Sequence, residues 1–152
     1  YLRETMKHTN GVNVHWLGVT RPPWITYYKP YSADTTQARC GRRWGRLMLY
    51  DRGRLIPWHR SSLKNSSMTY QKPSKKISDL MKRYGGEPSM FQYPESWTGG
   101  ESLAHIVTTR SWITYCREVE RRFGTKIFLG CICTQDIQTL IDTWNWCEEN
   151  NL

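Results

Sequence analysis

The first part of the chain alternates apolar and polar side chains until prolines interrupt the pattern. This alternation predicts a strand over residues 12–19. Pro22 and Pro23 have no backbone N–H to donate to a sheet, so the strand must end before them. The β-branched and aromatic residues 24–28 predict a second short strand. Residues 31–41 show no period and predict a connection.

The clearest hairpin pattern in the chain covers residues 46–58. Two apolar runs flank Asp51, Arg52 and Gly53. Gly53 can supply the positive φ that a tight turn requires. Pro57 ends the second strand or places it at the edge of its sheet, because proline cannot donate to a neighbouring strand.

A polar segment and a short helix follow the hairpin. Residues 60–76 are rich in serine and lysine and predict a mobile loop. A helix is expected from Ser74 or Lys75 to Tyr84, with two glycines as its stop. Its apolar face consists of Ile77, Leu80, Met81 and Tyr84. Residues 87–100 hold prolines and glycines around Phe91, Tyr93 and Trp97, which predicts an ordered loop pinned by aromatic side chains.

The remaining chain has an α-β-α rhythm. A helix from residue 103 is expected to break near Thr109, with Ser111 capping a second helix that ends at a glycine. Residues 125–133 are almost wholly apolar and predict a central strand covered on both faces. Thr134 is expected to cap a final amphipathic helix. The apolar face of that helix consists of Ile137, Leu140, Ile141, Trp144 and Cys147.

These elements predict a mixed α+β fold, with an N-terminal antiparallel sheet that contains the hairpin and a C-terminal α-β-α segment. The length of 152 residues is typical of one domain, so residues 1–152 are expected to form a single unit. The chain begins at Tyr1 instead of a methionine, which suggests a C-terminal piece of a longer protein.

Charge is distributed unevenly along the chain. The whole sequence holds 22 basic and 13 acidic side chains, a net charge of +9. Residues 1–86 hold 17 basic and 4 acidic side chains, a net charge of +13, and residues 87–152 hold 5 and 9, a net charge of −4. Such asymmetry indicates a surface for an acidic partner or a solvated face that keeps the protein soluble. Because no apolar run approaches the roughly 20 residues of a membrane span, no membrane partner is expected.

Five cysteines raise the question of metal binding. Cys131 and Cys133 could join Cys116, Cys147 or His105 in a zinc site, but their spacing matches no usual zinc motif. Free buried thiols in a reducing compartment are the favoured alternative. The chain also contains no phosphate-binding glycine loop, nucleophile elbow or zinc-deaminase signature. We therefore expect no enzymatic activity and no cofactor.

The richest recognition segment interleaves arginines with aromatic rings. Its candidate partner-binding residues are Arg39, Arg42, Arg43, Trp44, Arg46, Arg52, Arg54, Trp58, His59 and Arg60. Alternation along the first hairpin strand separates Leu47 and Leu49, on the core side, from a face carrying Arg46, Met48 and Tyr50. That second face is expected to be a basic, aromatic platform. Such a platform suits an acidic protein surface or a single-stranded nucleic acid, while a merely solubilising hairpin is the third reading.

Three segments resemble a known viral family. Residues 16–31 (WLGVTRPPWITYYKPY), 40–59 (CGRRWGRLMLYDRGRLIPWH) and 82–88 (KRYGGEP) are similar to the Bel2-derived part of the Bet accessory proteins of foamy viruses. The resemblance implies a non-enzymatic antagonist that binds host APOBEC3 cytidine deaminases and keeps them out of viral particles. It implies a host protein as the partner and the host cytoplasm, or also the nucleus, as the location. It transfers no binding residues.

Overall fold

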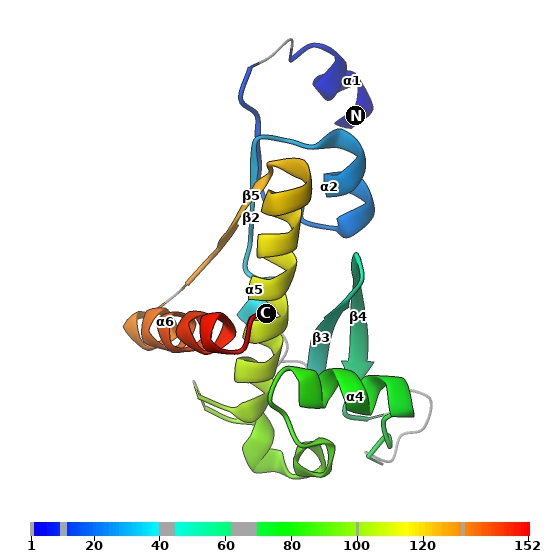
Figure 1. Ribbon diagram of the computed structural model, residues 1–152, viewed down its shortest axis with the longest axis vertical. Helices are drawn as coiled ribbons and strands as arrows, with labels where there is room; N and C mark the ends of the chain where they lie inside the picture. The colour runs from blue at the N-terminus through cyan, green and yellow to red at the C-terminus, as the bar shows by residue number, and fades with distance from the viewer. Residues whose placement is uncertain (1, 10–11, 40–44, 62–69, 100, 132) are drawn as a thin grey trace.

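The protein has a mixed α+β fold organised along one long helix (Figure 1). This computed structural model describes residues 2–9, 12–39, 45–61, 70–99, 101–131 and 133–152. The central helix, α5 (Leu103–Phe123), contacts the hairpin, the parallel sheet and the last helix. The chain starts in a short helix, α1 (Leu2–Lys7), at the far end of the molecule from the hairpin (Figure 1). No helix of the described part has the length and apolar character needed to cross a membrane.

Helix α5 is continuous, so the predicted break near Thr109 is wrong. Ser102 caps its first turn by accepting a hydrogen bond from the backbone of His105, and Gly124 ends it at a φ of 71°. Ser111 is buried inside the helix and does not cap one; its hydroxyl accepts from the backbone N–H of Tyr50 at 2.5 Å. The polar residues that suggested a break therefore face the hairpin and the core.

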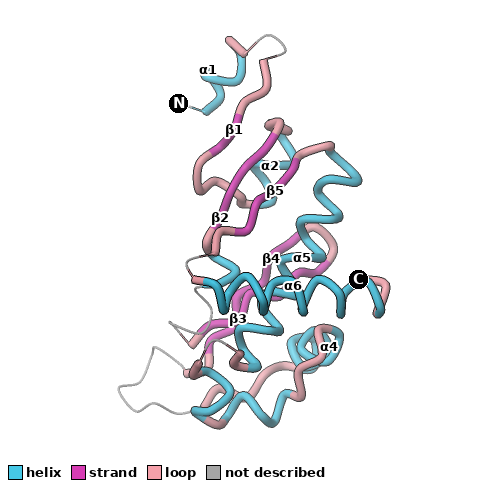
Figure 2. Tube along the Cα trace, turned by 90° about the vertical axis from the view of Figure 1, so that its left-hand side faces the viewer, coloured by secondary structure: helices cyan, strands magenta, loops and turns pink. Residues whose placement is uncertain are grey.

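A three-stranded parallel sheet packs against one part of α5 (Figure 2). Its order is β1 (His15–Trp16), β2 (Ser32–Thr35) and β5 (Lys126–Leu129). Two predictions fail here. The strand expected over residues 12–19 shrinks to two residues, and the apolar strand expected at the centre, β5, lies at an edge with Phe128 exposed. The central strand is β2, in the segment predicted as a connection.

The segment predicted as a second strand is a helix, α2 (Pro22–Tyr28). Its two prolines occupy the first helical turn, where their missing N–H groups would have no partner and their fixed φ suits a helix. Ile25 is buried, and the exposed Tyr27 lies on the solvent side. The β propensity of the WITYY residues is thus overridden by the helix start that precedes them.

The hairpin prediction is confirmed. Strands β3 (Arg46–Asp51) and β4 (Arg54–His59) pair in an antiparallel ladder from Arg46 opposite His59 to Asp51 opposite Arg54. Arg52 and Gly53 both have positive φ, 45° and 83°, as a two-residue type I′ turn requires. The hairpin forms a separate sheet, however, so among the described strands the antiparallel pairing expected for the whole N-terminal half occurs only between these two.

Helix α4 (Lys75–Arg83) is confirmed, with Ser74 as its N-cap. The ordered loop after it contains two short 3-10 helices, η1 (Pro88–Gln92) and η2 (Pro94–Trp97). Phe91 and Trp97 are buried, as expected, whereas Tyr93 is half exposed. Of the predicted mobile loop at residues 60–76, residues 62–69 lie outside the described part.

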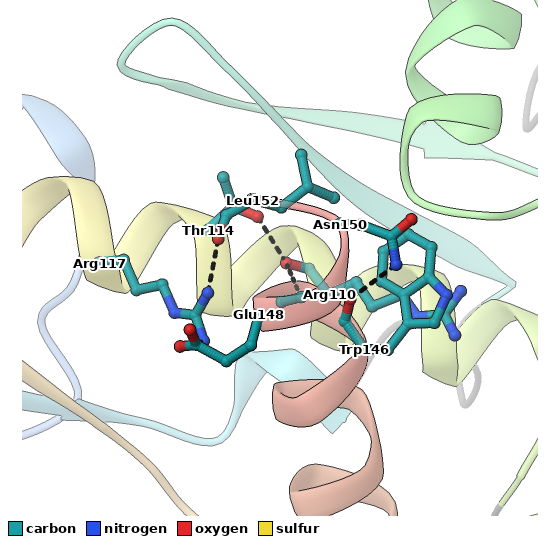
Figure 3. A network of polar contacts seen from close by, with 8 residues as sticks. Arg110, Thr114, Arg117, Trp146, Glu148, Asn150 and Leu152 are labelled. Atoms are coloured by element: carbon teal, nitrogen blue, oxygen red, sulfur yellow. Dashed lines mark hydrogen bonds and ion pairs between the residues drawn. The ribbon is translucent and has the colours of Figure 1, made fainter.

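The last helix, α6 (Thr134–Glu149), crosses α5 and is capped by Cys133, one residue before the predicted cap. Figure 3 shows how its end is held: the Arg110 guanidinium lies 3.5 Å from the centre of the Trp146 ring, and Arg117 contacts the Leu152 carbonyl and Glu148. The buried face of α6 is mainly polar and consists of Asp136, Thr139, Thr143 and Cys147. Of the predicted apolar face, Cys147 is buried, whereas Ile137, Ile141 and Trp144 are about half exposed, at 49, 48 and 45%.

Candidate partner-binding site

The predicted recognition residues divide into three groups. Arg42, Arg43 and Trp44 lie outside the described residues. Arg39 and Trp58 are structural. The others surround the hairpin and consist of Arg46, Arg52, Arg54, His59 and Arg60.

Arg39 forms an internal ion pair, which corrects its assignment to a contact surface. Its guanidinium lies 2.5 Å from a carboxylate oxygen of Asp136, and the two side chains are only 14 and 2% exposed. Asp136 also accepts a hydrogen bond from the backbone N–H of Cys133 at the start of α6. The pair therefore ties the segment after β2 to the N-terminus of α6.

Trp58 belongs to the aromatic core, so it cannot be an exposed stacking ring. It is 5% exposed, and its ring stacks on that of Trp97 with centroids 6.1 Å apart and planes inclined by 26°. Tyr70 and Phe91 contact the same indole edge to face. The neighbouring Arg60 is partly buried and donates to the Gln92 carbonyl at 3.3 Å.

The predicted open platform on β3 is largely covered by α5. Tyr50 and Met48, on the same face as Arg46, are only 3 and 9% exposed. The centroids of the Tyr50 and Tyr115 rings lie 5.4 Å apart, and the Tyr84 hydroxyl donates a hydrogen bond to the Tyr50 carbonyl at 2.7 Å. Both faces of β3 are therefore packed over most of the strand. The part of this face that stays uncovered is a groove beside the Arg46 end of the strand.

This groove, which we call the hairpin groove, has a volume of about 320 Å³. Its lining residues are Thr20, Arg21, Pro22, Pro23, Gln37, Arg46, Met48, Leu55, Pro57 and Trp112. The wall is part apolar, from β3, β4 and the start of α2, and part cationic, from two arginines. Among the described residues no carboxylate lines it.

Two buried donors at the hairpin groove lack acceptors. The indole N–H of the fully buried Trp112 and the Nε–H of Arg46 form no hydrogen bond with any described residue. The carbonyl of Thr20, another lining group, already accepts a hydrogen bond from the Tyr115 hydroxyl at 2.8 Å. Both donors have almost no accessible surface, so they are not open to a molecule seated in the groove.

The turn of the hairpin adds two exposed guanidinium groups. Arg52 and Arg54 are exposed, and within the described part of the chain neither forms an ion pair. Asp51, the last residue of β3, forms an ion pair with Lys76 instead, with 2.7 Å between the lysine Nζ and a carboxylate oxygen. That hydrogen bond from Lys76 holds the pKa of the Asp51 carboxyl below its usual range. The turn arginines thus keep their charge available to another molecule.

The four cysteines of the described residues do not gather into the zinc site that the sequence left as an alternative. Burial raises the pKa of the Cys116 thiol to about 12, and burial also raises the pKa of Cys147. Cys131 and Cys133 are exposed beside the start of α6, away from the interior positions of the other two. Among the described residues no three His, Cys, Asp or Glu side chains gather closely enough to hold a metal ion.

Of the residues that line the groove, the sequence named only Arg46 as a candidate contact; Arg21, Gln37 and Trp112 are among those it missed. Arg21 precedes the proline pair, Gln37 lies in the segment predicted as a connection, and Trp112 sits on the apolar face of α5. No local pattern brings these positions together, because the groove forms only when α2, the hairpin and α5 pack.

Searches of family models, curated proteins and solved structures gave no significant match to this chain.

Proposed function

We propose that the protein is a non-catalytic binding module whose hairpin region contacts an acidic surface of a partner protein. The observation that carries this proposal is the set of guanidinium groups at Arg21, Arg46, Arg52 and Arg54, none of which forms an ion pair with a described residue. Arginine pairs carboxylates in a planar, bidentate geometry and is enriched in interface hot spots. A groove beside these side chains offers a partner a place to bury part of its surface.

The resemblance to Bet accessory proteins supports a specific class of partner. We propose that the partner is a host APOBEC3 cytidine deaminase, held in the host cytoplasm by binding and sequestration. In this proposal the chain performs no reaction, so its effect depends on how much partner it occupies and not on turnover.

A protein partner fits the hairpin better than a single-stranded nucleic acid does. Non-specific binding of single strands relies on exposed aromatic rings on which bases stack. At the hairpin, Trp58 and Tyr50 are buried, and their rings are already packed against aromatic neighbours. The charge remains suited to phosphates, so nucleic acid is the competing outcome of the experiment below.

The test is co-purification with such a deaminase after nuclease treatment. The variant Arg52→Glu/Arg54→Glu reverses two exposed charges at the turn, and Lys75→Glu/Lys82→Glu makes the same charge change on exposed positions of α4. Both should leave circular dichroism and melting nearly unchanged, because exposed substitutions cost little. We expect the turn variant to lose at least tenfold in affinity and the α4 variant to stay close to wild type.

Two results would overturn this function. Loss of the wild-type complex on nuclease digestion would assign the contact to nucleic acid, and its affinity should then fall steeply with salt. Equal weakening by the two charge reversals would show that only overall charge matters and that the hairpin has no special role.

A further inference from the structure

Two exposed thiols lie in the short connection between the parallel sheet and the last helix. Cys131 and Cys133 follow β5 and directly precede the first residue of α6. Both side chains are exposed, whereas Cys116 and Cys147 are buried. Among the described cysteines, this pair is therefore the one that a reagent in solution can reach without unfolding the protein.

Chain connectivity keeps the two thiols within reach of each other. One residue separates Cys131 from Cys133, and an extended chain advances at most about 3.6 Å per residue, so their Cα atoms are at most about 7 Å apart. Disulfides usually join Cα atoms that are roughly 4.4–6.8 Å apart. The two sulfurs also interact: partial burial, and to a lesser extent the charges of Asp136 and Cys133, raise the pKa of the Cys131 thiol. The pair thus meets the distance requirement for an internal disulfide.

The surroundings of the two sulfurs differ, which assigns them different roles. Cys133 is the N-cap of α6, where the positive end of the helix dipole favours a negatively charged group. The nearby Asp136 carboxylate is paired with Arg39, so its own charge is largely compensated. The raised pKa of Cys131 keeps more of that thiol protonated. Because the thiolate is the attacking form, Cys133 is the expected nucleophile and Cys131 the resolving thiol.

We propose that Cys131 and Cys133 form a redox-active dithiol, which a low-molecular-weight disulfide such as glutathione disulfide converts into an internal disulfide. The Cys133 thiolate attacks one sulfur of glutathione disulfide, and the first glutathione leaves as a thiolate. Cys131 gives its proton to solvent, and its sulfur then attacks the Cys133 sulfur and displaces the second glutathione. The cysteine pair loses two electrons and two protons, and glutathione disulfide is reduced to two molecules of glutathione. This site is independent of the function proposed for the hairpin.

Oxidation of the pair also acts on the start of α6. An extended backbone holds Cα atoms two residues apart near the upper limit of the disulfide range, so closing the bridge draws the two residues together. In the dithiol form Cys133 is extended, with φ −142° and ψ 165°. Its N–H donates to the Asp136 carboxylate at 3.2 Å, and that carboxylate pairs with Arg39. We expect the bridge to weaken this cap and to loosen the first turn of α6.

Redox titration of the whole chain tests the site. The protein is equilibrated at increasing ratios of glutathione disulfide to glutathione, quenched with acid, alkylated and digested with chymotrypsin. Cleavage after Leu129 and Leu140 gives residues 130–140, which contain Cys131 and Cys133 but not Cys147. We expect this peptide to pass from a doubly alkylated form to an unalkylated form that is two hydrogen atoms lighter than the dithiol.

Single substitutions separate the two roles. Cys131→Ser removes the resolving thiol, so a glutathione adduct on Cys133 should accumulate at least about tenfold above wild type. Cys133→Ser removes the attacking thiol and should slow the reaction at least about fivefold, and serine is itself a good N-cap, so this variant keeps α6. Cys40→Ser is the matched control, since it removes a thiol outside the pair, and its titration should coincide with that of wild type.

Amide hydrogen exchange measures the effect on α6. In the disulfide form, the amides of residues 133–137 should exchange at least about fivefold faster than in the dithiol form. The amides of β3 in the hairpin provide the internal reference and should exchange at the same rate in both forms.

The outcomes that contradict the site are specific. A persistent glutathione adduct on the wild-type chain, a disulfide from either cysteine to Cys40 or to a second chain, or two free thiols in a large excess of glutathione disulfide would overturn the internal bridge. Equal exchange of the α6 amides in both forms would overturn its coupling to the helix. The charge reversals at the hairpin turn test the proposed function separately, so either proposal can fail alone.

Discussion

Helices α4 and α6 carry apolar side chains at the same spacing, but only one of them buries that face. In α4, Leu80, Met81 and the adjoining Tyr84 are almost fully buried against the hairpin side of the molecule. In α6, Ile137 and Ile141 remain about half exposed. Periodicity therefore identifies the residues that share a helix face, but it does not decide whether that face is covered.

Specific polar contacts decide the orientation of α6. Asp136 must face inward to pair with Arg39. The hydroxyls of Thr139 and Thr143 bond to carbonyls of their own helix, at 3.0 and 2.7 Å, and so can be buried without outside partners. Arg117 then holds the last turn through Glu148. A helix anchored in this way turns its more apolar side outward.

The largest effect is expected from removing the anchor of α6. Asp136→Ala leaves the Arg39 guanidinium buried without its counter-charge, which should lower the free energy of unfolding by about 3–5 kcal/mol. Urea denaturation followed by circular dichroism measures this loss. Asp142→Ala, on the exposed side of the same helix, is the matched control and should change stability by less than about 0.5 kcal/mol. Equal losses would mean that the ion pair does not orient α6.

A direct comparison of the two apolar faces should give the next largest difference. Met81→Ala opens a cavity at a fully buried site of α4 and should cost about 2–5 kcal/mol. Ile141→Ala on α6 should stay within about 0.5 kcal/mol, since the side chain is half exposed and alanine favours helix. Thermal and urea unfolding of both variants provide the measurement. A loss above about 2 kcal/mol for Ile141→Ala would show that its face is covered.

The smallest effect is expected from Tyr84, on the buried side of α4, which should make the protein less stable in alkaline solution. Burial raises the pKa of Tyr84 from 10.0 to about 12. The contribution of Tyr84 to the free energy of unfolding is fully present below pH 10 and is lost as the pH rises through 12, because the tyrosine ionises first in the unfolded chain. At pH 11 the loss is on the order of 1 kcal/mol. Unfolding free energies at pH 9 and 11 measure it. Tyr84→Phe should show a smaller decrease, and an identical decrease would assign it to other groups.

The fold could be predicted from the sequence where local chemistry decides it. The Arg52–Gly53 turn and the Ser74 cap are short-range signals, and both elements form as expected. Strand β2 was missed because its Ser-Ala-Asp-Thr sequence has no apolar run; it becomes central only through strands from distant parts of the chain. Helix α2 replaces the predicted strand because the two prolines at its start outweigh the β propensity of the aromatic residues that follow.

The candidate site shows the same limit. Sequence reasoning identified the arginine-rich segment, since residue type and density suffice for that. It could not separate Arg39, held by a carboxylate from the last helix, from Arg54, which stays free of ion pairs among the described residues. Nor could it place Trp112 beside Arg46, because their proximity depends on how α5 packs against the hairpin.

The pairing order of the parallel sheet has a consequence for biosynthesis. Ser32 is bonded on one side to a strand made just before it, and on the other to a strand beginning at Lys126. While the chain is being synthesised, β2 therefore waits with one open edge until α5 has been completed and β5 emerges. An unpaired strand edge is a template for association with other chains. Translation products that stop before Lys126 should aggregate, whereas chains that reach the end of β5 can close the sheet within one molecule.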